Sequence, residues 1–181
     1  MKGQVIITLT VAALFTISSC GNKKKAQEGE NSSSSKSPAA MGQQAEDVGI
    51  AFSDDRIAMA FEEYQQIRMA LINSNFEEVR VKASALGLKL ADDNFEIESI
   101  VLDVATAQNI EKQRELFAQL TTTLEPIIKK SLSAGTVYKQ FCPMAFNNEG
   151  GYWLSTVSEI YNPYFGDRML RCGKVTETIE K

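Results

Sequence analysis

The chain has 181 residues, a formal net charge of −4 and no histidine. Without histidine there can be no Ser-His or Cys-His nucleophile pair, no histidine general base and no imidazole ligand for zinc or copper(II). The mildly acidic balance argues against nucleic acid as a partner, because nucleic-acid binding requires a basic face. We therefore expect a protein that is not an enzyme and that binds no nucleic acid.

The N-terminus has the pattern of a secretory signal. Lys2 precedes an apolar run over residues 5–17, which is shorter than the ~20 residues that a bilayer-spanning helix requires. The run leads into Ser18-Ser19-Cys20-Gly21, which resembles the lipobox of bacterial lipoproteins. We predict that residues 1–20 form a lipoprotein signal and that Cys20 carries the lipid. An ordinary secretory signal with an incidental cysteine is the alternative.

The residues after the lipobox predict a location and a linker. Gly21, where an inner-membrane lipoprotein would have Asp, resembles the sorting signal for the outer membrane, so we expect a lipid-anchored envelope protein that faces the periplasm. Residues 21–49 are rich in Lys, Ser, Gly, Gln and Glu and poor in large apolar side chains, which predicts a flexible tether. Residues 50–181 have the length of one domain.

Apolar residues at helical spacing predict four helices in the first part of this domain. The four stripes are Ile57, Phe61, Tyr64, Ile67 and Leu71; Phe76, Val79, Ala83, Leu86 and Leu90; Ile97, Ile100, Val101 and Val104; and Ile110, Phe117, Leu120, Leu124 and Ile128. The expected N-caps are Ser53 or Asp54, Asn75 in a capping box with Glu78, and Asn109. Pro126 should bend the last helix. Because the connections are short, we predict a mainly α fold, an up-down four-helix bundle.

The chain changes character over residues 136–181, where turn formers and aromatic side chains gather. The aromatic residues are Tyr138, Phe141, Phe146, Tyr152, Trp153, Tyr161, Tyr164 and Phe165. Residues 136–141 alternate as a strand does, residues 147–151 are rich in turn formers, and residues 152–154 suit a returning strand. Gly173 is expected to end a short helical turn that carries Met169 and Cys172. We predict a small irregular C-terminal cap that contains a short β-hairpin.

Four sulfur side chains in this cap form a candidate metal site: Cys142, Met144, Met169 and Cys172. Thiolates and thioethers are soft donors, which suit copper(I) or silver(I) better than zinc, calcium or magnesium. Met169 and Cys172 are three residues apart and would share one face of a helical turn. Cys142 and Met144 are two apart and would point the same way in a strand.

A disulfide between Cys142 and Cys172 is the competing interpretation. These are the two cysteines that remain once Cys20 carries lipid, and the expected compartment is oxidising. The bond would close a loop of about thirty residues and stabilise the fold by about 3–4 kcal/mol. Met144 and Met169 would then pack against aromatic rings as ordinary core methionines. Both interpretations stay open, because reduction of the bond would expose the same thiols to a metal.

The amino-acid sequence of the cap resembles that of a family of extracytoplasmic bacterial domains of unknown function. The matching motifs are Tyr138-x-Gln140-Phe141-Cys142-Pro143-Met144-Ala145-Phe146, Gly151-x-Trp153-Leu154-Ser155, Ile160-x-Asn162-Pro163-Tyr164-Phe165-Gly166 and Met169-Leu170-x-Cys172-Gly173, with a helical part similar in style at Glu111-Lys112-Gln113-Arg114-Glu115-x-Phe117. Such domains occur as free-standing lipoproteins and, in related form, on periplasmic adaptors of copper/silver efflux systems. Cys-Pro-Met also looks like the opening of short heavy-metal-binding modules, which continue with His-Pro where this chain has Ala145-Phe146.

The resemblance implies a role in metal handling. We expect a lipid-anchored envelope protein that binds a soft ion, copper(I), through Cys142, Met144, Met169 and Cys172, and that serves a heavy-metal efflux adaptor. The alternative is a structural or interaction module that holds its shape with the Cys142–Cys172 disulfide and binds no metal. Its docking residues would be Tyr152, Trp153, Tyr164 and Phe165.

Overall fold

The structure, a computed structural model, describes residues 49–90 and 95–181. The predicted signal peptide, the lipidation site Cys20 and the tether up to residue 48 lie outside this part. The main helices are α1 (Asp55–Ile72), α2 (Phe76–Leu90), α3 (Phe95–Thr106) and α4 (Ile110–Ser131). Each packs against the next in the chain, and α4 also packs against α1. These helices confirm the four that were predicted, and α4 continues through Pro126. None of the helices in the described residues is long and apolar enough to cross a bilayer.

Local side-chain chemistry starts three of these helices where the sequence predicts. Asp54 Oδ1 accepts a hydrogen bond of 2.9 Å from the backbone N–H of Arg56 at the start of α1. At α2, Asn75 Oδ1 accepts from the backbone N–H of Glu78 at 3.2 Å, and Asn75 Nδ2 donates to the Glu78 carboxylate, so Asn75 is the predicted N-cap although its own backbone N–H bonds Ala70 instead of completing the capping box. Asn109 Oδ1 accepts from the backbone N–H of Lys112 at 2.8 Å. Each cap satisfies a backbone donor that has no partner within the first turn.

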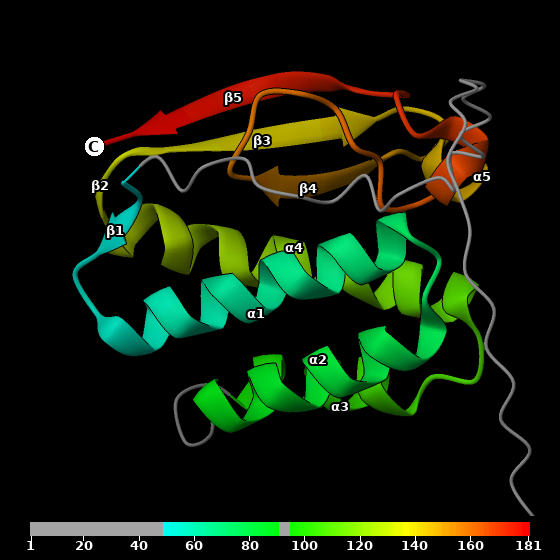
Figure 1. Cartoon of the computed structure of the whole chain (residues 1–181), viewed down its shortest axis with the longest axis horizontal. Coiled ribbons are helices and arrows are strands. Elements are labelled where there is room, and N and C mark those ends of the chain that lie inside the picture. The colour runs from blue at the N-terminus through cyan, green and yellow to red at the C-terminus, as the bar shows by residue number, and fades with distance from the viewer. Residues whose placement is uncertain (1–48, 91–94) are drawn as a thin grey trace, which may run out of the picture. The chain divides into compact units, whose positions relative to one another are not determined.

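Two antiparallel sheets accompany the helices. A small sheet pairs β1 (Ala51–Phe52) with β2 (Leu132–Ala134), and a larger sheet has the strand order β4 (Gly151–Ser155), β3 (Thr136–Cys142), β5 (Lys174–Glu180). In Figure 1, β3 lies between its neighbours, α1 and α4 run beside the sheet, and α2 and α3 form the layer farthest from it. The β3–β4 hairpin confirms the strand prediction.

The predicted fold class is wrong, because the domain is mixed α/β rather than a helical bundle with a small hairpin cap. The missed strand β5 reads KVTETIE, and only Ile179 of its seven residues is buried. It has no alternation of apolar and polar residues to mark it as a strand. The pairing of β1 with β2 joins segments some eighty residues apart, as in Ala51 opposite Ala134. The pairing of β1 with β2 could not be predicted from local pattern, whereas four β-branched residues in β5 were a local strand signal that was missed.

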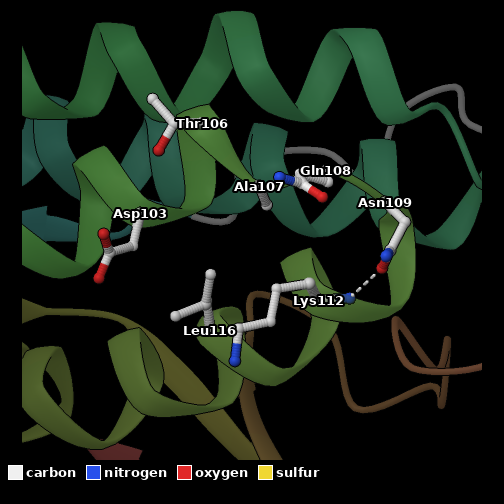
Figure 2. Close-up of a pocket in the computed structure, with 7 residues that line it drawn as sticks. All are labelled: Asp103, Thr106, Ala107, Gln108, Asn109, Lys112 and Leu116. Carbon is white, nitrogen blue, oxygen red and sulfur yellow. Dashed lines mark hydrogen bonds between the residues drawn. The ribbon is translucent and has the colours of Figure 1, made fainter.

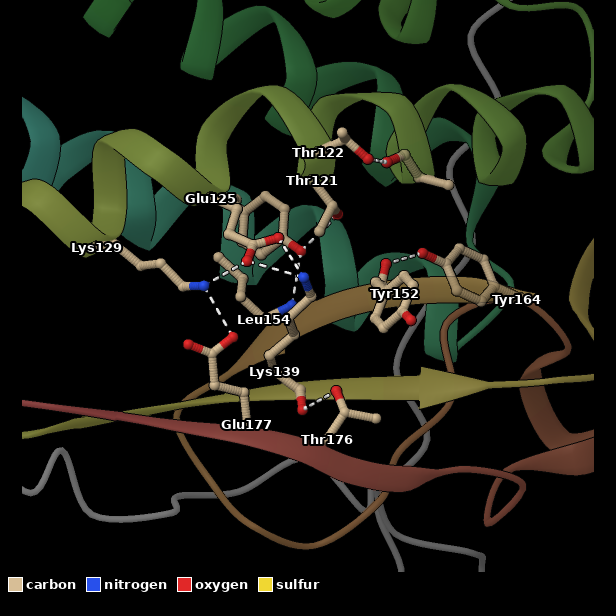
Figure 3. Close-up of polar contacts among 12 residues, drawn as sticks. Thr121, Thr122, Glu125, Lys129, Lys139, Tyr152, Leu154, Tyr164, Thr176 and Glu177 are labelled. Carbon is tan, nitrogen blue, oxygen red and sulfur yellow. Dashed lines mark hydrogen bonds and ion pairs between the residues drawn. The ribbon is translucent and has the colours of Figure 1, made fainter. Parts of the chain in front are cut away.

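The free side of β4 is closed by side chains from elsewhere in the fold. The backbone N–H of Leu154 donates to Tyr64 Oη at 3.0 Å, and Gln65 Nε2 donates to the carbonyl of Leu154 at 3.2 Å. The hydroxyl of Tyr164 donates to the carbonyl of Tyr152, as Figure 3 shows. Helix α1 therefore supplies hydrogen-bond partners that a further strand would otherwise provide.

A left-handed turn follows β3. The short element α5 (Ala145–Asn148) contains Phe146 at φ 52° and Asn147 at φ 58°, and Asn148 has φ 72°. Backbone bonds from Glu149 N to the carbonyl of Phe146 and from Gly150 N to that of Ala145 close the turn. A 3₁₀ turn, η1 (Gly166–Met169), lies farther along the chain before β5.

Candidate functional site

The structure brings Cys142 and Cys172 together. Cys142 is the last residue of β3, and Cys172 follows η1 just before β5. Their Sγ atoms lie 3.1 Å apart as two free thiols. Cys142 is fully buried, whereas Cys172 is partly exposed. Solvent therefore reaches the pair from the Cys172 side.

The loop before β5 holds Cys172 in place through Asn162. The side chain of this buried asparagine donates from Nδ2 to the carbonyl of Cys172 at 2.9 Å, and its Oδ1 accepts from the backbone N–H of Tyr164 at 2.8 Å. The next residue, Gly173, has φ +148°, and a Cβ there would lie 2.9 Å from the Trp153 ring. Glycine is thus required beside the second thiol.

Both the neighbouring thiol and burial oppose ionisation of Cys172. A hydrogen bond with Cys142, followed by desolvation, raises the pKa of the Cys172 thiol. A raised pKa keeps the proton on sulfur and lowers the fraction of reactive thiolate at neutral pH. Cys172 therefore has the electrostatics of a structural cysteine rather than of an activated nucleophile.

The two methionines of the predicted metal site are placed differently from the thiols. Met144 caps the left-handed turn and has 48% of its surface exposed. Met169 is the last residue of η1 and is half-buried. Among the described residues, there is no group of three or more histidine, cysteine, aspartate or glutamate side chains that could hold a metal ion.

The structure places the four predicted docking residues at different depths. Trp153 is fully buried, with its Nε1 donating to Gln140 Oε1 at 2.6 Å, and Tyr164 is 4% exposed. Tyr164 meets Trp153 edge-on with ring centroids 5.8 Å apart. Phe165 is half-buried, and only Tyr152, 42% exposed, presents much of its ring to solvent. Trp153 and Tyr164 build the core, because their large apolar rings gain most from burial.

An ion-pair network that the sequence analysis missed joins α4 to the sheet (Figure 3). Glu125 on α4 accepts from Lys139 of β3 and from Lys129, each at 2.7 Å. Lys129 also pairs with Glu177 of β5 at 2.8 Å. Burial raises the pKa of Glu125, but hydrogen bonds from Lys129 and Lys139 outweigh it and hold the pKa below its usual value. Of this network, only the ion pair between Glu125 and Lys129 could have been predicted from the sequence, because the two residues are four apart on one helix.

Two surface depressions lie away from the thiol pair. One, of about 320 Å³, is lined by Asp103, Thr106, Ala107, Gln108, Asn109, Lys112 and Leu116 (Figure 2). The other, of about 580 Å³, is lined by Ser53, Asp54, Ile57, Pro126, Ile127, Lys130 and Ser131. Within the first, Asn109 is engaged in capping α4 and Lys112 in an ion pair with Glu115. Neither depression is lined by a sulfur-bearing residue.

Comparison of the chain with protein-family models, with curated proteins and with solved structures finds no match.

Proposed function

We propose that this protein is a lipid-anchored envelope protein whose domain is an interaction module, held in shape by a disulfide between Cys142 and Cys172. The lipobox-like sequence at Cys20 supports the lipid anchor, and the 3.1 Å approach of the two thiols supports the disulfide. The bond would tie the end of β3 to the residue before the turn into β5. It would close a loop of about thirty residues, which stabilises the fold by about 3–4 kcal/mol.

Charge favours the disulfide over a metal at this position. A disulfide is neutral, whereas two thiolates with one monovalent ion keep a net negative charge. The hydrogen bond with Cys142, followed by burial, raises the pKa of Cys172, so the Cys172 thiolate that a metal would need is disfavoured. Bond formation removes two hydrogens, and a disulfide-bearing oxidoreductase of an oxidising compartment is the class of oxidant that accepts them.

Mass spectrometry of the protein isolated from cell envelopes, with free thiols alkylated on lysis, tests the proposal. We expect a peptide pair linked through Cys142 and Cys172 and lighter by two hydrogens than the free peptides. Reduction should then lower the free energy of unfolding by about 3–4 kcal/mol. Cysteines recovered fully alkylated would contradict the disulfide.

Copper(I) binding by the reduced pair is a second candidate function. It is supported by the adjacent thiols and by the exposed thioether of Met144, two residues after Cys142. Titration of the reduced protein with copper(I) against a competing chelator tests it, with the Cys142→Ser, Cys172→Ser double variant as the control. Binding that is no tighter than in the double variant would remove this candidate.

A further inference from the structure

The two sulfur atoms of the Cys142–Cys172 pair differ in their access from outside. Cys142 is fully buried, whereas Cys172 is partly exposed. Their Sγ atoms lie 3.1 Å apart as free thiols, so a movement of about 1 Å brings them to the bonded distance of a disulfide. A reagent that approaches the folded protein therefore meets Cys172 first.

Regular structure keeps Cys142 below the surface. It is the last residue of β3, the central strand of the larger sheet, and it pairs with Gly151 of β4. A Cβ on Gly151 would lie 2.6 Å from the Tyr164 ring, so this ring packs directly against the strand at the pairing. Exposure of the Cys142 thiol would require the β3–β4 hairpin to separate from its neighbours, which is a local unfolding event.

The segment that carries Cys172 is fixed through its backbone. The N–H of Cys172 donates to the carbonyl of Met169 at 3.0 Å, and its own carbonyl accepts from Asn162 Nδ2 at 2.9 Å. These bonds hold the residue against Cys142 without engaging its sulfur. The Cys172 side chain is thus both in contact with the buried thiol and open to a partner.

We propose that Cys172 is the sulfur through which this pair exchanges with a thiol–disulfide oxidoreductase of the envelope, and that Cys142 reacts only with Cys172. The Cys172 thiolate attacks one sulfur of the enzyme's disulfide, whose other sulfur leaves and takes a proton. Cys142 then loses its proton to solvent and attacks Cys172 Sγ, which breaks the mixed disulfide and releases the enzyme as a dithiol. Two electrons pass from the cysteine pair to the enzyme. This inference names a partner for the proposed disulfide and in that sense rests on it.

Alkylation of the reduced protein tests the order of access. In the mature chain, residues 20–181, Cys20→Ser leaves the two thiols of the pair, and Cys142→Ser or Cys172→Ser then leaves one. The rate of reaction with iodoacetamide is measured for each single thiol in the native and the unfolded protein. Unfolding should accelerate the reaction of Cys142 at least about 100-fold and that of Cys172 less than about tenfold, because the buried thiol reacts only when the hairpin opens. Comparing each thiol with itself removes differences in intrinsic reactivity.

A protein disulfide tests the class of partner. The probe is a thioredoxin that keeps one active-site cysteine, joined in a disulfide to thionitrobenzoate, whose release is followed by absorbance. Cys142→Ser should form a stable mixed disulfide with the thioredoxin through Cys172, whereas Cys172→Ser should form none. The chain with both thiols should pass through the same adduct and release the thioredoxin as the intramolecular disulfide closes.

Partial alkylation of the chain with both thiols keeps the test valid if a serine variant folds poorly. Mapped by mass, the first modification should fall on Cys172. Equal protection of the two thiols, earlier modification of Cys142, a mixed disulfide with Cys172→Ser or none with Cys142→Ser would each overturn the proposal. Free thiols in protein isolated from envelopes would instead contradict the proposed disulfide, since the access test begins from reduced protein and has a separate readout.

Discussion

At the scale of single residues, Tyr64 shows how a helix and a sheet are joined in the core. Its ring stacks on Phe117 with centroids 4.8 Å apart, and its hydroxyl lies 2.8 Å from Thr121 Oγ1 and 3.0 Å from the backbone nitrogen of Leu154. Thr121 donates its own proton to the carbonyl of Phe117, so Tyr64 donates to Thr121 and accepts from Leu154. Burial raises the pKa of Tyr64 to about 12, which keeps this donor protonated. Periodicity predicted that Tyr64 is buried, but not where its hydroxyl points.

Tyr64→Phe should lower the free energy of unfolding by about 1–3 kcal/mol, because it leaves the buried N–H of Leu154 without an acceptor. Urea denaturation measures the change. Tyr161→Phe is the matched control, since that hydroxyl bonds the carboxylate of Glu159 at the surface and should cost under about 0.5 kcal/mol. Equal losses in both variants would show that the internal hydrogen bond does not stabilise the fold.

At the scale of elements, the left-handed turn α5 connects strands β3 and β4 of the hairpin and begins three residues after Cys142. The left-handed conformation costs an L-residue about 1–2 kcal/mol of conformational energy, and asparagine adopts it more readily than most residues. Asn147 is exposed, so its backbone conformation rather than a side-chain contact decides which residue fits there. The turn formers predicted a turn at residues 147–151, but composition does not specify handedness.

Asn147→Ala should destabilise the protein by about 1 kcal/mol, whereas Asn147→Gly should be neutral or stabilising, because glycine has no Cβ to clash at positive φ. Thermal or urea unfolding gives the order. The control is Asn73, an exposed residue at φ −80° that ends α1, where glycine should not be preferred over alanine. Alanine as stable as glycine at position 147 would contradict the assigned conformation.

At the scale of the whole molecule, the ion-pair network around Glu125 connects helix α4 to the larger sheet. It links α4 with β3 through Lys139 and with β5 through Lys129 and Glu177. The carboxylate of Glu125 is only 14% exposed, so solvent screens its ion pairs less than those at the surface. Its pKa is lower in the folded state than its usual 4.5, so its contribution is present above that pH and is lost as pH falls through the folded-state pKa.

Glu125→Gln should therefore lower stability at pH 7 by about 1–3 kcal/mol, and the difference from the unmodified protein should shrink as the pH falls below about 4. Urea unfolding at a series of pH values measures it. Glu115→Gln, at a carboxylate that is 51% exposed and pairs with Lys112, should show little of this pH dependence. A loss that stays constant down to pH 3 would mean that the charge of Glu125 is not what stabilises the interface.

Local sequence patterns were enough to predict the four main helices, their caps, the β3–β4 hairpin and the pairing candidates Cys142 and Cys172. These rest on local information, since apolar spacing, capping side chains and turn formers act within a few residues. Contacts between distant segments place β5 in the sheet, bury Trp153 and Tyr164 in the core and leave Met144 exposed. These features could not be predicted from local pattern, because burial and strand pairing depend on which distant segments come into contact.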